Sequence, residues 1–145
     1  MMPRFRAWDK IHKTMYEDGD IVSIDIEKSQ ICVKTPFFEQ LNRYNFRDID
    51  LMQSTGFTDK DGKDIFRGDI VTSRNDLFKG VVILRQDLGT YVINLIGYKN
   101  FERLCNVADS THIIGNIYEN LELLEVNNEQ TTTKKSSNEK RLKTL

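Results

Sequence analysis

Three aspartates gathered around a glycine are the residues whose types and spacing come nearest to a chemical site. Asp59, Asp61 and Asp64 surround Gly62 in the stretch TGFTDKDGKDIFRGDIV, residues 55–71. Alternating carboxylates before a glycine suggest a calcium loop, which needs ligands at positions 1, 3 and 5, glycine at 6 and glutamate at 12. Counted from Asp59, the glycine falls at position 4 and the twelfth residue is an isoleucine. The sequence therefore does not predict a calcium loop.

A phosphate-binding loop is not predicted either. Gly56, Gly62 and Gly68 recur every six residues, but the frame G-x-x-x-x-G-K-[ST], which supplies the backbone amides and the hydroxyl, is missing. Turn chemistry accounts for the residue types, because Gly62 can adopt positive φ and Asp61 is a favoured turn residue. Gly68 before Asp69 suits a tight bend at the entry to a strand. We predict that residues 55–71 form a turn that feeds a strand.

The N-terminal stretch PRFRAWDKIHK is the second candidate site. It interleaves Arg4, Arg6 and Lys10 with Trp8, and basic residues beside aromatics can bind single-stranded nucleic acid by phosphate contacts and base stacking. These four residues are the candidate binding surface.

The same stretch is also explained as a first β-strand. Phe5 and Ala7 would then point inward, and Arg4, Arg6 and Trp8 would occupy the other face, with Trp8 covering a subunit contact. Both interpretations remain open from the sequence.

The histidines and cysteines do not predict a site. His12 and His112 lie far apart, without a neighbouring Cys or His at ligand spacing, so a zinc site is not expected and His112 is expected at the edge of a strand. A Cys105–His112 pair lacks a third, orienting group. Cys32 and Cys105 are expected to be buried free thiols. We predict no catalytic residue, no metal and no cofactor.

The charge is distributed unevenly along the 145 residues. Residues 1–126 hold 16 Lys/Arg against 20 Asp/Glu, which gives −4, whereas residues 127–145 hold 5 against 2, which gives +3. A body that binds a nucleic-acid duplex is normally basic on one face, and the overall charge does not favour that class. The polar, basic tail is expected to be flexible. No signal peptide or apolar membrane span is recognised, so a cytoplasmic location and no membrane partner are expected.

The pattern of apolar residues predicts a mainly β protein. Alternation in residues 20–26 and 30–35 predicts a hairpin, with Val22, Ile24 and Ile26 on one face. Residues 47–53 are predicted to be a strand, and residues 36–46 fit a loose helical stripe or a loop with one helical turn. Further short strands are predicted at residues 64–73, 80–86, 90–97, 101–107 and 112–118, with a short helix over residues 118–126. Such regular short strands indicate a small barrel or sandwich.

Three blocks of the sequence resemble the YopX family, a group of small proteins of phages and prophages in Gram-positive bacteria. The blocks are FRAWDK (residues 5–10), LMQSTGFTDKDGKDIFRGDIV (residues 51–71) and HIIGNIYENLELL (residues 112–124). One departure is Leu121, where the family usually has proline. The resemblance implies a β-rich fold with an SH3-like barrel in the second half and homo-oligomerisation. It implies no catalytic residue.

Together these observations predict three regions: an N-terminal β-rich segment at residues 1–63, an SH3-like barrel at residues 64–126 and a tail at residues 127–145. The expected function is that of an uncharacterised phage accessory protein, a non-enzymatic oligomeric binding module for nucleic acid or for a host or phage protein. A structural, self-assembling protein without a ligand is the alternative, and an enzyme is the least favoured class because no nucleophile, metal set or cofactor loop is found.

Overall fold

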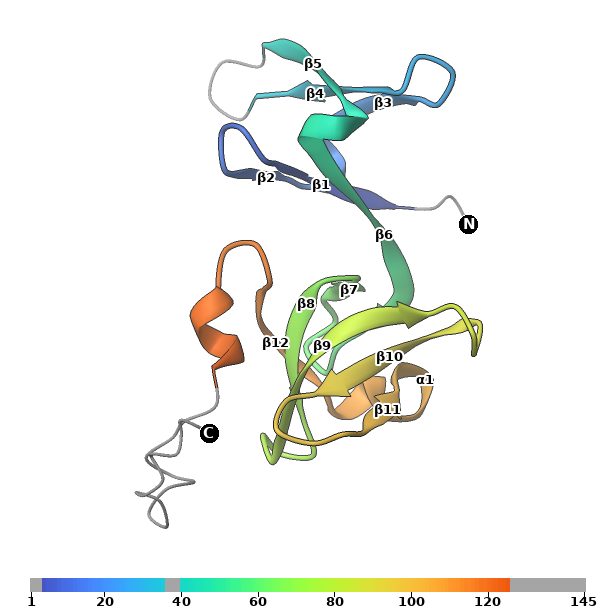
Figure 1. Ribbon diagram of the computed structural model, residues 1–145, viewed down its shortest axis with the longest axis vertical. Coiled ribbons are helices and arrows are strands. Elements are labelled where there is room, and N and C mark those ends of the chain that lie inside the picture. Colours follow the sequence, from blue (N-terminus) through green and yellow to red (C-terminus); the bar gives the residue numbers. More distant parts are fainter. Residues whose placement is uncertain (1–3, 36–39, 126–145) are drawn as a thin grey trace.

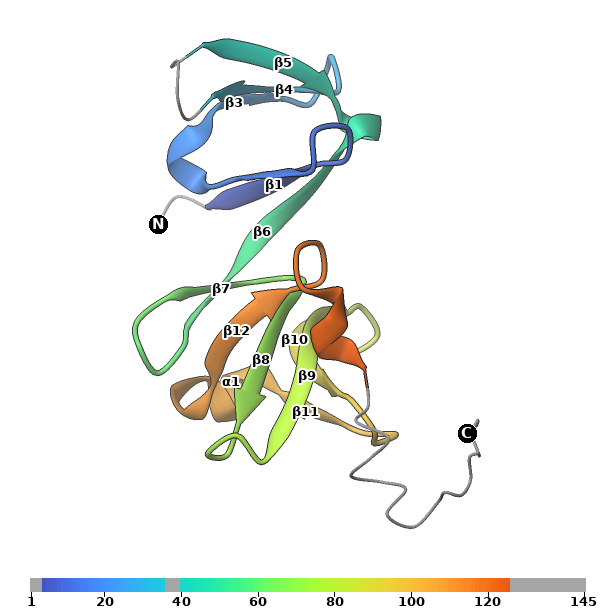
Figure 2. The same cartoon turned by 90° about the vertical axis from the view of Figure 1, so that its left-hand side faces the viewer.

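Two β-rich lobes are joined by one long strand in the computed structural model, which describes residues 4–35 and 40–125 (Figures 1 and 2). Strand β6 begins in the first lobe and ends in the second. The strands of the first lobe are β1 (Phe5–Asp9), β2 (Thr14–Tyr16), β3 (Ile21–Asp25), β4 (Gln30–Lys34), β5 (Leu41–Asn45) and β6 (Ile49–Thr58). Those of the second are β7 (Asp64–Phe66), β8 (Asp69–Ser73), β9 (Phe78–Arg85), β10 (Thr90–Leu95), β11 (Phe101–Arg103) and β12 (His112–Asn116).

The first lobe packs a three-stranded sheet, β3-β4-β5, over the β1–β2 hairpin and the start of β6. Its core contains Ala7, Tyr16, Ile31, Val33 and Ile49. The predicted hairpin is confirmed as β3 and β4.

The predicted apolar face of β3 is only partly correct. Ile24 packs against the core as predicted. The pairing register shifts between Ile21 and Ser23, and such a bulge places an extra residue in one strand, so that Ile21 packs against the core and Val22 is exposed. Ile26 lies in the turn after β3 and is exposed.

The second lobe is a strongly curled antiparallel sheet with the strand order β11-β10-β9-β8-β12 (Figure 2). Its core is aliphatic and includes Ile65, Val71, Val82, Ile93 and Leu104. The mainly β prediction is confirmed, and the SH3-like detail stays a prediction. Within the described residues no helix is long and apolar enough to cross a membrane.

Several predicted elements differ from those observed. Residues 101–107 form β11 followed by the one-turn helix α1 (Leu104–Val107), because Leu104 and Val107 point into the core at helical spacing. Residues 41–45 form a strand paired with β4, which overturns the helical stripe and the loop, while a single turn of 3-10 helix follows at Phe46–Asp48. Residues 36–39 lie outside the described part. The expected helix over residues 118–126 is a 3-10 helix, Leu121–Leu124.

Candidate functional site

The loop between β6 and β7 is organised by the carboxylate of Asp59. Its Oδ1 accepts hydrogen bonds from the backbone N–H groups of Asp61 and Lys63, both at 2.9 Å, and Gly62 closes the turn with φ 83°. Gly68 likewise has φ 92° at the bend between β7 and β8. The predicted turn is confirmed, and glycine is favoured at these φ values because an L-residue with a Cβ atom would be strained there.

Asp59 also fastens this loop to β12. Its Oδ2 accepts the N–H of Ile113 at 3.1 Å, and the N–H of Lys60 donates to the carbonyl of Thr111 at 2.9 Å. Burial raises the pKa of Asp59, but the three backbone N–H groups outweigh burial and hold the pKa below its usual value. Asp59 is therefore a buried, ionised anchor, only 4% exposed.

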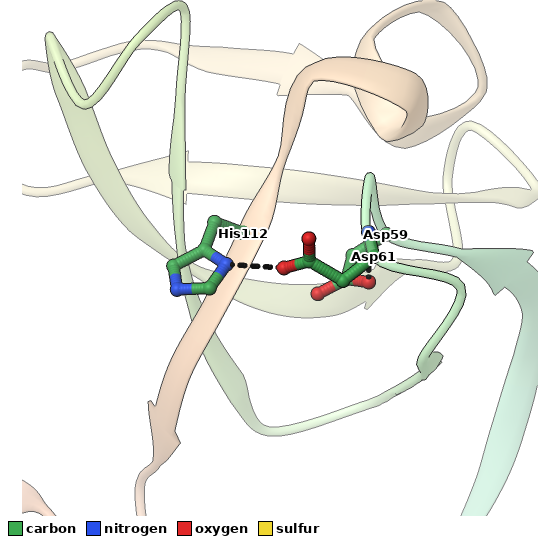
Figure 3. Close-up of side chains that lie close together, drawn as sticks. All are labelled: Asp59, Asp61 and His112. Carbon is green, nitrogen blue, oxygen red and sulfur yellow. Dashed lines mark hydrogen bonds and ion pairs between the residues drawn. The ribbon is translucent and has the colours of Figure 1, made fainter.

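His112, the first residue of β12, meets this loop. Its Nδ1 lies 2.8 Å from Oδ2 of Asp61 (Figure 3). Asp59, Asp61 and His112 each offer one metal-ligand atom, and these atoms all lie within 4.8 Å of one another. Asp64 is not part of this group, because its carboxylate pairs with Arg4 at 2.6 Å.

Sequence reasoning missed this cluster. It placed His112 at a strand edge, which is correct, but gave it no partner. His112 is 51 residues from Asp61, so no local spacing links them. Only the packing of the β6–β7 loop on β12 brings them together.

The four residues of the predicted binding surface do not share one exposed face. Arg4 and Lys10 are partly exposed and pair with Asp64 and Asp50. Arg6 and Trp8 are 7% and 8% exposed, because both faces of β1 are covered. The Ala7 face packs into the first lobe and the Arg6–Trp8 face packs on the second.

The contact between the lobes is built on Arg6 and Trp8. The indole of Trp8 stacks on Tyr118, with ring centroids 5.5 Å apart, and packs with Met52 and Phe66. The guanidinium of Arg6 lies 4.8 Å from the centroid of the Phe66 ring. The predicted contact of Trp8 with another subunit is replaced here by a contact within the chain.

Arg6 forms a buried ion pair across the lobes. Its Nη2 lies 2.6 Å from Oδ1 of Asp69, whose other oxygen accepts the N–H of Phe66 at 2.8 Å. Burial raises the pKa of Asp69 above its usual value, and the Arg6 charge opposes that rise. Both residues line a cleft of about 530 Å³, together with Glu17, Lys63 and Asn116.

A second hollow lies at one end of the second lobe, between the β8–β9 and β10–β11 loops. It has a volume of about 520 Å³ and is lined by Leu77, Phe78, Leu95 and Tyr98 with the ion-paired Arg74 and Glu102. Leu77 is 70% exposed and Tyr98 59%, and Tyr98 packs edge-to-face on Phe78. We call this hollow the apolar groove.

The cysteines are both free, as predicted, but only Cys32 is buried. Cys105 is exposed because it lies on the outer side of α1, whose inner residues Leu104 and Val107 face the core. The sulfur of Cys105 contacts Oδ1 of Asn106 at 3.6 Å, and among the described residues no hydrogen bond joins it to His112.

Comparison with known proteins decides the family. The family model described as YopX protein matches residues 4–125. This chain belongs to the YopX family. The resemblance of the three sequence blocks is thereby confirmed.

Solved structures support the YopX fold. Protein EF1440 from Enterococcus faecalis is 27% identical, with a TM-score of 0.58 over 86% of this chain and 99% of that chain. Protein YopX from Bacillus subtilis is 22% identical, with a TM-score of 0.56 over 84% of this chain and 98% of that chain. No curated protein matches this YopX-family chain significantly.

Proposed function

We propose that this protein is a non-enzymatic binding module of a phage or prophage, and that its second lobe holds a protein partner in the apolar groove. The carrying observation is the exposure of Leu77 and Tyr98 at the mouth of this hollow. Contiguous exposed apolar side chains with a polar rim are typical of protein interaction sites. Aromatic residues are also enriched in the buried centres of such interfaces.

A protein partner fits this surface better than nucleic acid does. The rim charges of the groove, Arg74 and Glu102, neutralise each other, so the groove does not offer the phosphate contacts that dominate nucleic-acid binding. Burial removes Arg6 and Trp8 from any stacking surface of this chain. The exposed Arg4 and Lys10 are each already paired with a carboxylate.

The test is co-purification of a defined host or phage protein from infected cells, with nuclease added. Leu77→Ser and Tyr98→Ser should each lower the affinity for the partner at least tenfold, because hot-spot residues of an interface carry most of its affinity. The matched control is Ile26→Ser in the first lobe. Ile26 is 74% exposed, and its replacement should leave the affinity for the partner unchanged. Equal retention by the groove variants and the control would refute this assignment.

Nucleic acid remains the second partner class, and titration of DNA and RNA at two salt concentrations tests it. Saturable binding that weakens steeply with salt would show that the partner is nucleic acid and not a protein. Comparing the full chain with residues 1–126 would show whether the basic tail or the body binds it.

We also propose that the module self-associates in the cytoplasm of the host cell. Strands β3 and β5 each have one side unpaired within the described residues, and unpaired strand edges can pair with a second chain. Light scattering after gel filtration measures the mass. A monomer at all concentrations would contradict self-association and would leave the groove proposal standing.

A further inference from the structure

We propose that Asp59, Asp61 and His112 form a binding site for a first-row divalent metal ion, with Zn²⁺ as the representative. This site is separate from the apolar groove. Two carboxylates and an imidazole converge from the β6–β7 loop and from β12 (Figure 3). The argument rests on their separation, their support and their chemistry.

The separation suits a single ion. The ligand atoms lie within 4.8 Å of one another, whereas ligands around one Zn²⁺ ion, bonded at about 2.0–2.2 Å, lie roughly 3–3.6 Å apart. A contraction on the order of 1 Å is needed. Asp61 and His112 can supply it by side-chain rotation, because their side chains are 52% and 43% exposed.

The support comes from Asp59. Its carboxylate is buried and held by three backbone N–H groups, so one ligand is fixed before the ion arrives. Among the residues that the structure describes, only the Ile113 N–H donates to Oδ2, which leaves a lone pair for a metal. The loop and β12 are also joined by the Lys60–Thr111 backbone bond. A site built on such a rigid frame loses little entropy on binding.

The chemistry selects the metal. Ca²⁺ and Mg²⁺ prefer oxygen ligands only, whereas imidazole suits Zn²⁺ and its first-row neighbours. Three protein ligands leave a fourth tetrahedral position for water. The ion would bridge the β6–β7 loop and β12, and it would therefore stabilise the second lobe against unfolding.

The chain contains its own control in the β1–β2 turn. There, Nδ1 of His12 lies 2.8 Å from Oδ2 of Asp9, the same distance as in the His112–Asp61 pair. Among the described residues, however, His112 has a second carboxylate within reach, that of Asp59, whereas His12 is not part of such a cluster. An ordinary histidine–aspartate pair and a metal site can therefore be distinguished within one protein.

The experiment is calorimetric titration of the full chain with Zn²⁺ and, separately, with Mg²⁺, at one pH. We expect one Zn²⁺ per chain and no measurable Mg²⁺ binding. His112→Ala and Asp61→Asn should each weaken Zn²⁺ binding by at least about tenfold, and His12→Ala should leave it unchanged. Circular dichroism confirms that the exposed-site variants are folded.

A second readout follows the effect of the ion on stability. Thermal unfolding with Zn²⁺ should show a higher Tm for the wild type and for His12→Ala, and a clearly smaller rise for His112→Ala. The proposal is overturned if Zn²⁺ does not bind, if binding survives both site variants, or if His12→Ala abolishes it.

Discussion

Asp9 organises the β1–β2 turn in the way that Asp59 organises the β6–β7 loop. Its buried carboxylate accepts the N–H groups of Ile11 and His12 and contacts the His12 ring. Burial raises the pKa of Asp9, but these hydrogen bonds from His12 and Ile11 outweigh burial and hold the pKa below its usual value. The ionised carboxylate is therefore a source of stability.

Asp9→Asn should destabilise the protein at neutral pH by about 2 kcal/mol, the usual value of hydrogen bonds to a charged group. Because the pKa of Asp9 is lower in the folded state than in the unfolded state, the ionised carboxylate stabilises the protein at pH values above the unfolded-state pKa of about 3.9. This stabilisation is lost as the pH falls through the folded-state pKa. The difference between wild type and variant should therefore shrink below about pH 4. Urea unfolding at several pH values measures it.

Asp109→Asn is the control for this prediction. Asp109 is exposed and its side chain makes no hydrogen bond within residues 4–35 and 40–125, so its replacement should have no effect at any of these pH values. A difference for Asp9→Asn that stays constant with pH would show that the carboxylate charge is not what stabilises the turn.

The sequence identified the residues of the turns but not their partners. Asp61, Gly62 and Gly68 were predicted as turn residues because their conformational preferences are local. The bonds from Asp59 to Ile113 and from Asp61 to His112 depend on tertiary packing. No pattern within one element contains that information.

At the scale of elements, the β6–β7 loop depends on the positive φ of Gly62. A Cβ atom at Gly62 would meet no atom within 4 Å, so a loss of stability in Gly62→Ala must come from the backbone. We expect a loss of about 1 kcal/mol or slightly more, the cost of a left-handed conformation for an L-residue. The denaturation midpoint measures it.

Gly19→Ala is the matched control, since a Cβ atom there also meets open space and φ is not positive. It should leave the midpoint nearly unchanged. If both variants behave alike, the loop adapts to a Cβ atom and does not require its glycine.

The elements predicted correctly carry a local signal. The β3–β4 hairpin alternates along the chain, and the strands of the second lobe are short β-rich runs bounded by turn residues. Two deviations changed the outcome: the bulge at Ile21–Ser23 placed Ile21 rather than Val22 on the core side, and the helical turn at Leu104–Val107 interrupted an apparent strand. A short apolar run does not distinguish these alternatives.

At the scale of the whole molecule, both faces of β1 are covered, and for this reason the predicted binding surface is not exposed. Alternating basic and aromatic residues suggested an exposed side. Instead the second lobe covers Arg6 and Trp8, and Asp69 neutralises the buried guanidinium. Sequence gives the alternation of β1, but it does not reveal that a second lobe covers the polar side.

Arg6→Met should therefore weaken the lobe contact strongly. It leaves the Asp69 carboxylate buried without its cation, which typically costs about 3–5 kcal/mol. Trp8 is the sole tryptophan, so its fluorescence reports directly on this contact and should shift to the red as the indole becomes exposed. Guanidinium unfolding followed by Trp8 emission measures both effects.

Two variants separate charge from packing. Arg6→Met combined with Asp69→Asn removes the unpaired charge but keeps an oxygen that can accept the Phe66 N–H, and it should recover most of the stability. Arg4→Met, just before β1, breaks the half-exposed pair with Asp64 and should cost no more than about 1 kcal/mol. If Arg6→Met is as mild as Arg4→Met, with Trp8 emission unchanged, the two lobes are held by apolar contacts alone. A large loss that the double variant recovers would instead show that the cost of Arg6→Met is the unpaired Asp69 carboxylate buried at the lobe contact.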